Sequence, residues 1–410
     1  MDLIRKRYLE QIRPFYESDL IKVLTGIRRS GKSVLLNTIK AELQQQGIPG
    51  SRIISINLED LDFSYIKTAN DLNTEIKSRI QGNEKHYIFL DEIQHVENFE
   101  KALASFRATL NASIFVTGSN SKLLSGELAT LLTGRTVEFE IFPFSFIEMK
   151  EYFELNGRDF SKELVYNYIK WGGFPVRFDF HEENATRRYL ENLYAGIVGN
   201  DLLKASNSSQ KKQFLDISLY ILANAGRDFS AERIADAYNE EHASNGKKSI
   251  SSKTICNYVE RLEKAFLIHK VKRFDIFGKR PLKSKDKFYA VDTGLRIIQT
   301  NSIVFEDTFF LENIVYNELR QRGYTVYIGK TYKGEVDFIA IKDGKKCFIQ
   351  VAYLLANEKT IEREFGAFSP IRDASPKYVI SLDKVNMGRN GIAHINLVDF
   401  LLQKQDLQTT

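Results

Sequence analysis

The sequence predicts an α/β chain made of three consecutive parts. Strand-type and helix-type segments alternate up to about residue 120, which is typical of a parallel sheet with helices on both faces. Helical periodicity then dominates the middle of the chain, and short strands return near its C-terminal end. The chain has 410 residues, which fits two to four domains at ~100–200 residues each.

The N-terminal part contains four short apolar runs that we interpret as strands. They cover residues 20–24, 52–60, 86–96 and 112–120. Residues 87–90 are apolar at every position, as a central parallel strand with two buried faces requires. The segments SVLLNTIKAELQQQ and NFEKALASFRATL have helical spacing and follow the first and third strands. We therefore expect a parallel sheet with helices packed on both faces.

The remaining sequence indicates two further domains. From about Glu148 the pattern is helical, and the polar segment 206–213 is a plausible boundary. Three helical segments, 213–226, 229–241 and 251–266, precede two strands around a basic turn, which is the pattern of a winged helix. Near Phe305 a helix and several strands begin, and Asp343-Gly344 marks a hairpin turn. The predicted domains are residues 1–205, 206–300 and 301–410.

Composition excludes several classes of protein. No run approaches the ~20 apolar residues that span a bilayer, and the N-terminus lacks the apolar centre of a signal peptide. Two distant cysteines, Cys256 and Cys347, argue against a disulfide framework, and six scattered histidines give no zinc-ligand spacing. We expect a cytoplasmic protein without a membrane partner. The net charge of +5 decides little by itself.

The octapeptide GIRRSGKS, residues 26–33, fits the pattern G-x-x-x-x-G-K-[ST] between a predicted strand and a predicted helix. Glycines let backbone N–H groups wrap phosphates, the lysine neutralises phosphate charge, and the serine hydroxyl binds magnesium. The sequence therefore predicts ATP and Mg2+ as cofactors. The predicted nucleotide-binding residues are Gly26, Ile27, Arg28, Arg29, Ser30, Gly31, Lys32, Ser33 and Val34. The two arginines are either solvated near phosphate or contact a neighbouring subunit or the rest of this chain.

Four further positions complete a predicted hydrolysis site. Asp91 ends a buried-type strand, where it can bind magnesium together with Ser33, and Glu92 is placed to orient the attacking water. Asn120, with Ser119 as a competitor, ends the next strand and could contact the γ-phosphate or the water. Arg135 is either an arginine finger or a surface arginine; if it acts in trans, the protein is a homo-oligomer. The predicted catalytic residues are Lys32, Glu92, Asn120 and Arg135.

Four segments together resemble one family of AAA-type P-loop ATPases of bacteria and archaea. They are IKVLTGIRRSGKSVLL, YIFLDEIQHVENFEKAL, VTGSNSKLLSGELATLLTGRTVEFEIFPFSF and WGGFP, and the resemblance covers essentially the whole chain. It implies a P-loop NTPase sheet with a helical lid, a winged helix, and a C-terminal domain similar to PD-(D/E)XK nucleases. It also implies a Walker A loop at 26–33, Walker B at Asp91–Glu92 and sensor one at Asn120. The TGR element that ends at Arg135 matches a recurrent feature of the family.

A winged helix places its third helix in the major groove and its wing along the backbone, so DNA is the expected partner. The candidate side chains on the third helix are Lys253, Asn257 and Arg261, which share a face. The hairpin region 270–287 adds eight cations against two aspartates, and we assign Lys279, Arg280, Lys283 and Lys285 to DNA. The alternative is a lid or a module that contacts a protein partner.

The C-terminal domain offers Glu312, Asp337 and Gln350 at the positions where PD-(D/E)XK nucleases hold magnesium. Ala352 stands at the lysine position, and Gln350 replaces a negative ligand by a neutral one. We therefore expect a degenerate nuclease fold that binds nucleic acid or a partner without cutting.

The expected function is Mg2+-dependent ATP hydrolysis coupled to binding or remodelling of DNA. One alternative is an ATP-controlled conformational switch that binds a protein partner through its C-terminal domains. A third hypothesis, an ATP-dependent nuclease, is opposed by Ala352.

Overall fold

The computed structural model describes residues 3–119, 132–202, 208–242, 249–281, 286–298, 308–404 and 407. The chain divides into two compact units. The first comprises Met1–Pro143 and Lys264–Phe266, and the second comprises Phe144–Glu263 and Leu267–Thr410. No helix in the described ranges is both long and apolar enough to cross a membrane.

The first unit is built on a five-stranded sheet with the strand order β2-β3-β4-β1-β5, in which all neighbours pair in parallel. The strands are β1 (Ile21–Thr25), β2 (Ile53–Asn57), β3 (His86–Asp91), β4 (Ala112–Thr117) and β5 (Thr136–Glu140). Because the strands are parallel, all their carboxyl ends meet at one edge, where ligands of open α/β sheets bind.

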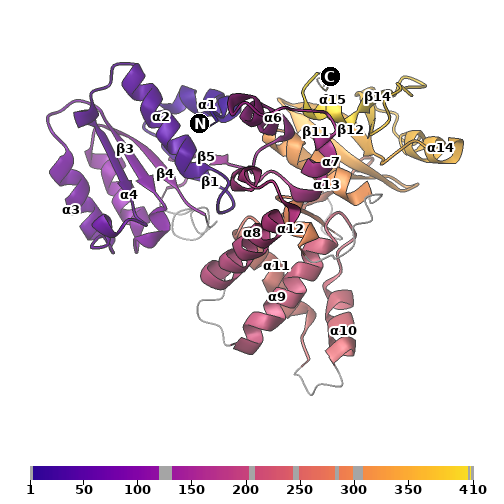
Figure 1. Ribbon diagram of the computed structural model, residues 1–410, viewed down its shortest axis with the longest axis horizontal. Helices are drawn as coiled ribbons and strands as arrows, with labels where there is room; N and C mark the ends of the chain where they lie inside the picture. The colour runs from indigo at the N-terminus through magenta and orange to yellow at the C-terminus, as the bar shows by residue number, and fades with distance from the viewer. Residues whose placement is uncertain are drawn as a thin grey trace. The chain divides into compact units, whose positions relative to one another are not determined.

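Helices cover both faces of this sheet (Figure 1). They are α1 (Lys6–Ile12), α2 (Lys32–Gln45), α3 (Ala69–Arg79) and α4 (Phe99–Thr109). Successive strand side chains point to opposite faces: Val23 and Ile88 pack with α3 and α4, whereas Leu24 and Phe89 pack with α1 and α2. The predicted parallel sheet with helices on both faces is confirmed. The edge strand β5, which is only partly buried, lacks a continuous apolar run and was not predicted.

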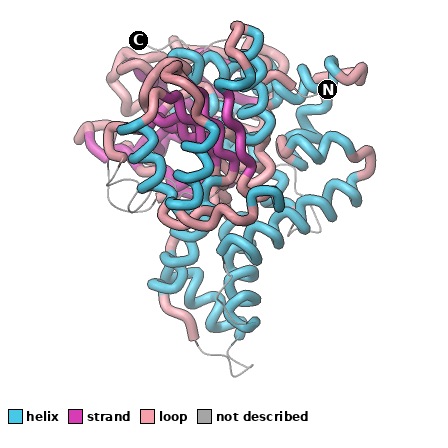
Figure 2. Tube along the Cα trace, turned by 90° about the vertical axis from the view of Figure 1, so that its left-hand side faces the viewer, coloured by secondary structure: helices cyan, strands magenta, loops and turns pink. Residues whose placement is uncertain are grey.

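The second unit begins with helices, labelled in Figure 1 and drawn in cyan with the other helices in Figure 2. They are α6 (Phe146–Leu155), α7 (Leu164–Trp171), α8 (Glu183–Gly196), α9 (Ser208–Ala223), α10 (Ala231–His242) and α11 (Ser252–Lys264). An antiparallel pair of strands follows, β6 (Ile268–Val271) and β9 (Lys287–Ala290), which agrees with the expected hairpin. After β9 comes the short helix α12 (Gly294–Ile297).

A mixed seven-stranded sheet, in the order β14-β13-β12-β11-β10-β7-β8, forms the rest of the second unit. Its strands are β7 (Arg273–Asp275), β8 (Arg280–Pro281), β10 (Thr325–Lys330), β11 (Glu335–Lys342), β12 (Lys345–Val351), β13 (Lys377–Ser381) and β14 (Ala393–Asn396). The accompanying helices are α13 (Thr308–Gln321), α14 (Glu358–Gly366) and α15 (Leu397–Leu401). Asp343 and Gly344 both have positive φ between β11 and β12, so the predicted hairpin turn is confirmed.

Strands β7 and β8 lie before residue 300 in the chain but join the sheet of the C-terminal part, because β7 pairs in parallel with β10. The strand expected over residues 267–276 is consequently divided at Lys272 into β6 and β7, which belong to different sheets. The sequence could not indicate this division, since both halves carry the same mixture of basic and apolar residues.

The segment WGGFP is a close-packing point of the second unit. A Cβ atom on Gly173 would lie 2.0 Å from the carbonyl oxygen of Phe144. The Gly173 N–H donates to Asp292 Oδ2 at 2.6 Å, and Gly294 N–H donates to the other carboxylate oxygen at 2.8 Å. Burial raises the pKa of Asp292 to about 6. Glycine is therefore required here by packing against Phe144 and Asp292.

Candidate nucleotide-binding site

The loop of residues 26–31 follows β1 and leads directly into α2. Gly26 and Gly31 have φ angles of 133° and 96°, which glycine adopts easily. A Cβ on Gly26 would also lie 2.3 Å from the carbonyl oxygen of Ile141, so this glycine is required by the approach of the segment after β5. Arg29 has a positive φ of 67° as well. The loop thus keeps a tightly bent backbone between strand and helix.

Lys32 is the first residue of α2 and is buried, with its ammonium group donating to the carbonyls of Gly26 and Ile27 at 3.0 Å each. No side chain caps the N-terminus of α2 at Gly31. The first N–H groups of a helix have no partner within the helix, and together with the helix dipole they favour an anion. The neighbouring Ser33 and Val34 are exposed.

Arg5, a residue that sequence reasoning missed, contacts the backbone of this loop. Its guanidinium is buried and donates to the carbonyls of Ser30 at 3.0 Å and Phe142 at 2.9 Å. It also stacks on Tyr8, whose hydroxyl accepts the N–H of Phe142. Arg5 therefore joins the loop to the segment that follows β5. Its position among the charged residues directly before α1 gave no signal of this contact.

Asp91 and Glu92 lie at the carboxyl end of β3, and the buried Thr117 at the end of β4 connects them. The Thr117 hydroxyl donates to Asp91 Oδ1 and accepts the backbone N–H of Glu92 at 2.9 Å. Glu92 has a φ of 54°, which is uncommon for a residue with a side chain and is often found at functional sites. Thr117 is a second residue that sequence reasoning missed; a polar residue that ends an apolar strand was the available signal.

The Glu92 carboxylate is held by two polar side chains. Gln94 Nε2 donates to Glu92 Oε2, and the Ser119 hydroxyl lies 3.3 Å from the same oxygen. Ser119, the competitor of Asn120, is thereby placed beside the residue predicted to orient water. Asn120 itself lies outside the described residues.

The two arginines of the loop differ in their surroundings. Arg28 forms an ion pair with Glu59, which follows β2, at 3.0 Å, whereas Arg29 is exposed. The structure thus places Arg28 in contact with the rest of the chain. Arg135 is exposed directly before β5, and its carbonyl accepts the N–H of Ile21.

The residues present fit a bound nucleotide with Mg2+. The Ser30 hydroxyl is buried and has no hydrogen-bond partner among the described residues. The uncapped α2 terminus and the glycine-containing loop suit phosphate. The described residues contain no group of three or more His, Cys, Asp and Glu side chains that could hold a metal. Mg2+ commonly uses one or two carboxylates together with the phosphates of its substrate. Ser33 and Asp91 are the residues that would hold it.

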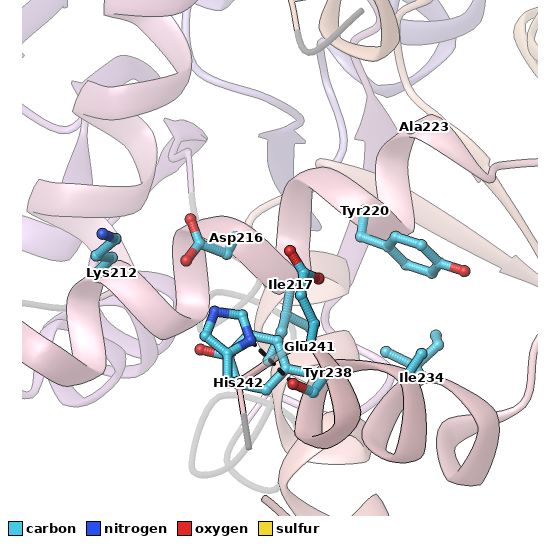
Figure 3. Close-up of a pocket in the computed structure, with 10 residues that line it drawn as sticks. Lys212, Asp216, Ile217, Tyr220, Ala223, Ile234, Tyr238, Glu241 and His242 are labelled. Carbon is cyan, nitrogen blue, oxygen red and sulfur yellow. Dashed lines mark hydrogen bonds between the residues drawn. The ribbon is translucent and has the colours of Figure 1, made fainter. Parts of the chain in front are cut away.

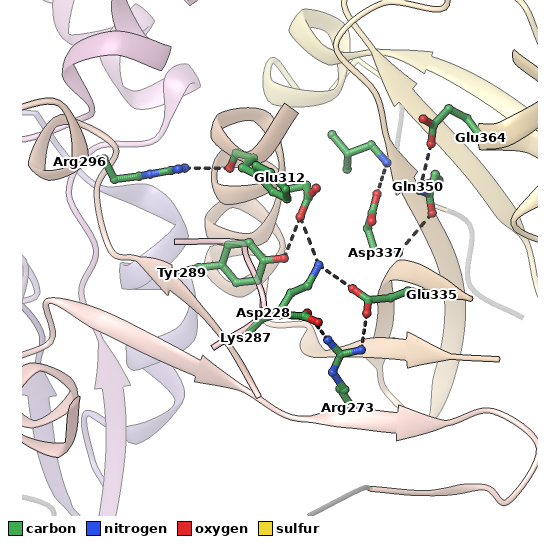
Figure 4. Close-up of polar contacts among 12 residues, drawn as sticks. Asp228, Arg273, Lys287, Tyr289, Arg296, Glu312, Glu335, Asp337, Gln350 and Glu364 are labelled. Carbon is green, nitrogen blue, oxygen red and sulfur yellow. Dashed lines mark hydrogen bonds and ion pairs between the residues drawn. The ribbon is translucent and has the colours of Figure 1, made fainter. Parts of the chain in front are cut away.

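The residues predicted as a vestige of a nuclease site form a buried polar cluster in the second unit (Figure 4). Glu312 and Asp337 are 4% and 8% exposed. Asp337 Oδ2 accepts the N–H of Val351 at 2.8 Å, and Gln350 donates to Glu364 at 3.0 Å. Burial raises the pKa of Asp337 to about 7 and that of Glu312 well above its ordinary value.

Two expectations from the sequence were wrong: that the cluster lacks a cation, and that the cations of 270–287 all lie at the surface. Lys287 of β9 is buried and pairs with Glu335 and, at 3.9 Å, with Glu312. Burial lowers the pKa of Lys287, but the carboxylates of Glu312 and Glu335 outweigh it and raise the pKa overall. Although position 352 is alanine, the cluster therefore has a cation from another strand. Arg273 is also buried and pairs with Asp228 and Glu335.

The expected basic surface at 270–287 is consequently smaller than its eight cations suggested. Arg273 and Lys287 are buried in ion pairs, and Lys270 pairs with Asp286 at 2.8 Å. Lys279 and Arg280 are exposed, whereas Lys283 and Lys285 lie outside the described residues. On α11, Lys253, Asn257 and Arg261 are all exposed, opposite the buried Ile255, Val259 and Leu262.

A pocket of about 510 Å³ lies between α9 and α10 (Figure 3). Its lining combines tyrosines, carboxylates and aliphatic groups, and none of the predicted site residues contributes to it. The lining residues are Lys212, Asp216, Ile217, Tyr220, Ala223, Ile234, Ala237, Tyr238, Glu241 and His242. The rings of Tyr238 and His242 stack with centroids 4.1 Å apart.

The fold and the loop of the first unit define a P-loop nucleotide-binding domain, and sequence comparison agrees. Residues 18–150 match a family described as an AAA domain, and residues 162–302 match a domain of unknown function (DUF8612). An uncharacterized protein of Haemophilus influenzae is 37% identical over 405 residues, which cover 97% of this chain and 98% of that protein. An uncharacterized protein of Methanocaldococcus jannaschii is 32% identical over 389 residues, which cover 90% of this chain and 81% of that protein. The chain belongs to the same family as these proteins and carries an AAA-type P-loop ATPase domain.

Solved structures give a weaker likeness. The Aeropyrum pernix ORC2 protein, in ADPNP–ADP complexes, has a TM-score of 0.43 at 13% identity, covering 77% of this chain and 92% of that chain. The A. pernix ORC1 protein in complex with DNA has a TM-score of 0.31 at 12% identity, covering 73% and 93%. Scores this low carry no weight for what the present chain binds.

Proposed function

We propose that the protein is a Mg2+-dependent ATPase whose hydrolysis cycle is coupled to binding or remodelling of DNA. The observation that carries the proposal is the bridge from Thr117 to Asp91 and Glu92 at the sheet edge that also holds the 26–33 loop. A phosphate loop alone supports nucleotide binding. A carboxylate pair held in a defined arrangement beside it supports hydrolysis.

Each residue has a role that follows from its position. The loop N–H groups and Lys32 bind the phosphates, while Ser33 and Asp91 hold Mg2+, which neutralises phosphate charge when bound. Glu92 orients the attacking water, and Gln94 and Ser119 restrain its carboxylate. Arg28 is restrained by Glu59 and so contributes charge at the margin of the phosphate site.

Coupling to DNA is supported by the second unit. We assign residues 1–205 to the ATPase domain with its helical lid, 206–300 to a winged helix and 301–410 to a degenerate nuclease-like domain, with β7 and β8 of the middle segment paired into the sheet of the last one. The exposed face of α11, with Lys253, Asn257 and Arg261, has the residue types that contact bases and phosphates. Lys279 and Arg280, at the β7–β8 turn, are two further exposed cations.

The central test measures ATP turnover of the full chain with and without duplex, forked and single-stranded DNA. We expect DNA to raise the rate several-fold, and Lys279→Glu combined with Arg280→Glu to abolish the rise without lowering basal turnover. Lys32→Ala should abolish turnover under every condition. Absence of any DNA binding at low salt would reject the coupling and leave the ATPase proposal standing.

Arg135 provides a test of assembly. We propose that it acts as an arginine finger in a neighbouring subunit of a homo-oligomer, because it is exposed immediately before β5. Mixing Arg135→Ala with Lys32→Ala should partly restore turnover if the site is shared, since each variant lacks a different half. Two inactive proteins that stay inactive when mixed would reject a finger supplied in trans, and wild-type turnover in Arg135→Ala alone would place Arg135 outside the reaction.

A second candidate function is an ATP-controlled switch that binds a protein partner. The pocket between α9 and α10 favours it, because Asp216 and Glu241 together with two tyrosines suit a basic, amphipathic segment. Under this hypothesis DNA does not stimulate turnover of the wild type. The variant Asp216→Ala with Tyr220→Ala should abolish nucleotide-dependent binding of the partner. A full DNA response in that variant would favour the first proposal.

A further inference from the structure

Two turns at one end of the seven-stranded sheet bring two exposed aromatic rings together. Strands β7 and β10 are parallel, with Asp275 opposite Lys330, so the turns that follow them lie side by side. The rings of Phe277 and Tyr332, one in each turn, have centroids 5.4 Å apart. Phe277 is 50% exposed and Tyr332 is 73% exposed, so much of each residue remains open to solvent. Packing within the fold does not account for two such rings.

Four exposed cations lie within three residues of one ring or the other along the chain. They are Lys279, Arg280, Lys330 and Lys333, and none of the four forms an ion pair within the described ranges. Asp275, the last residue of β7, accepts the N–H of Phe277 at 3.1 Å and so fixes the backbone that carries the ring. We call Phe277, Lys279, Arg280, Lys330, Tyr332 and Lys333 the aromatic–basic patch.

This combination has a chemical preference. Cations attract phosphates of any nucleic acid, but exposed rings gain stacking energy only from bases that are themselves unstacked and unpaired. In a duplex the base faces are already occupied by neighbouring base pairs, so the rings would contribute little. An acidic protein segment would use the cations and leave two flat rings without a partner of matching shape. The patch therefore suits a single strand better than either alternative.

We propose that the aromatic–basic patch binds single-stranded DNA, with Phe277 and Tyr332 stacking on bases and the four cations along the phosphates. The inference rests on the proposed function, in which DNA is the partner, and specifies the form of DNA. It also assigns residues from the β10–β11 turn, which the winged-helix pattern does not include. The patch would hold strands that are open at a fork or an end.

The test compares binding of a fluorescein-labelled oligothymidine and of a labelled duplex to the full chain by fluorescence anisotropy at low salt. Stacking contributes about 1–3 kcal/mol per base, so Phe277→Ala with Tyr332→Ala should weaken single-strand binding on the order of tenfold or more. Duplex binding should change by less than about twofold. Tyr332→Phe, which keeps the ring, should bind like the wild type, and Tyr166→Ala removes a comparably exposed ring on α7 as a control.

The charges are tested separately. Lys279→Ala with Lys333→Ala should weaken both forms of DNA and reduce the salt dependence of binding, because phosphate contacts release counterions. The inference would be overturned if the Phe277→Ala, Tyr332→Ala variant bound single strands as tightly as the wild type. It would also be overturned if that variant lost affinity equally for single strands and duplex. In both cases the proposal that the protein binds DNA would still stand. If the wild type binds neither form, the proposed function fails instead. Binding of labelled poly-L-glutamate that is lost in the Lys279→Ala, Lys333→Ala variant, without single-strand binding by the wild type, would identify an acidic protein as the partner.

Discussion

The hydroxyl group of Thr117 offers the sharpest test of the proposed hydrolysis site. Thr117→Val keeps the shape of a buried, β-branched side chain but deletes the oxygen that joins Asp91 and Glu92. The Glu92 N–H loses its acceptor, and the Asp91 carboxylate loses a donor. Glu92, whose backbone has a φ of 54°, then has no hydrogen bond to hold its N–H in place.

The size of the effect follows from these two bonds. A neutral hydrogen bond contributes about 1 kcal/mol net, and one to a charged group about 2 kcal/mol. We therefore expect Thr117→Val to lower the free energy of unfolding of the first unit by about 3 kcal/mol. Displacing a catalytic group by about 1 Å can reduce turnover about 100-fold, so the rate should fall much more than stability alone explains.

Three measurements on the full chain check this expectation. Denaturant unfolding followed by circular dichroism reports stability, steady-state phosphate release reports turnover, and a fluorescent ATP analogue reports binding. Nucleotide affinity should change little, because the 26–33 loop keeps its own contacts. The control is Thr117→Ser, which retains the hydroxyl and should keep stability and turnover close to the wild type.

Wild-type turnover in Thr117→Val would refute the reasoning, since the bridge could not then position the hydrolysing group. A loss of stability without a loss of turnover would show that the two bonds only hold β3 and β4 together. Equal losses in the valine and serine variants would show that any change of packing at this buried position causes the effect, and not the loss of the hydroxyl.

Three further outcomes are expected. Arg5→Met removes the donors to Ser30 and Phe142, so KM for ATP should rise several-fold in steady-state kinetics with a smaller change in kcat; an unchanged KM would contradict the support role. Burial lowers the pKa of Lys22 from 10.5 to about 7, so the unfolded chain binds more protons between these values, and stability should rise with pH across that window by up to about 5 kcal/mol. Denaturant titrations at pH 7 and 9.5 should show this rise, and Lys22→Met should remove it; the same rise in the variant would assign it elsewhere. Lys287→Met leaves Glu335 without this buried ion pair and should destabilise the second unit by about 3–5 kcal/mol, whereas Lys287→Arg should cost less, as thermal unfolding would show.

The N-terminal sheet and its phosphate loop were predictable because the information lies in contiguous segments. Four apolar runs defined strands, and GIRRSGKS needs only its own backbone and the strand and helix on either side. Arg5 and Thr117 were missed because their contacts are distant in sequence: Arg5 reaches partners 25 and 137 residues away, and Thr117 reaches Glu92 from a different strand. Side chains brought together by sheet pairing leave no local pattern.

The basic region shows the opposite error. Its eight cations formed a visible run in the sequence, yet Arg273 and Lys287 point into a buried cluster with Glu335. Burial of a charge depends on whether a carboxylate from another strand meets it, and charge counting along the chain cannot show that. For the same reason the sequence did not show that Lys287 supplies a cation to this cluster, in which alanine occupies the expected lysine position, 352.

The sequence by itself determined the α/β class of the first unit, the phosphate loop and the acidic pair at the end of β3, because each depends on local residue pattern. Only the tertiary structure decided which residues hold that pair in place, which cations remain at the surface, and that β7 belongs with β10. These features arise where separate strands are brought side by side, so their energies depend on partners that no single segment contains.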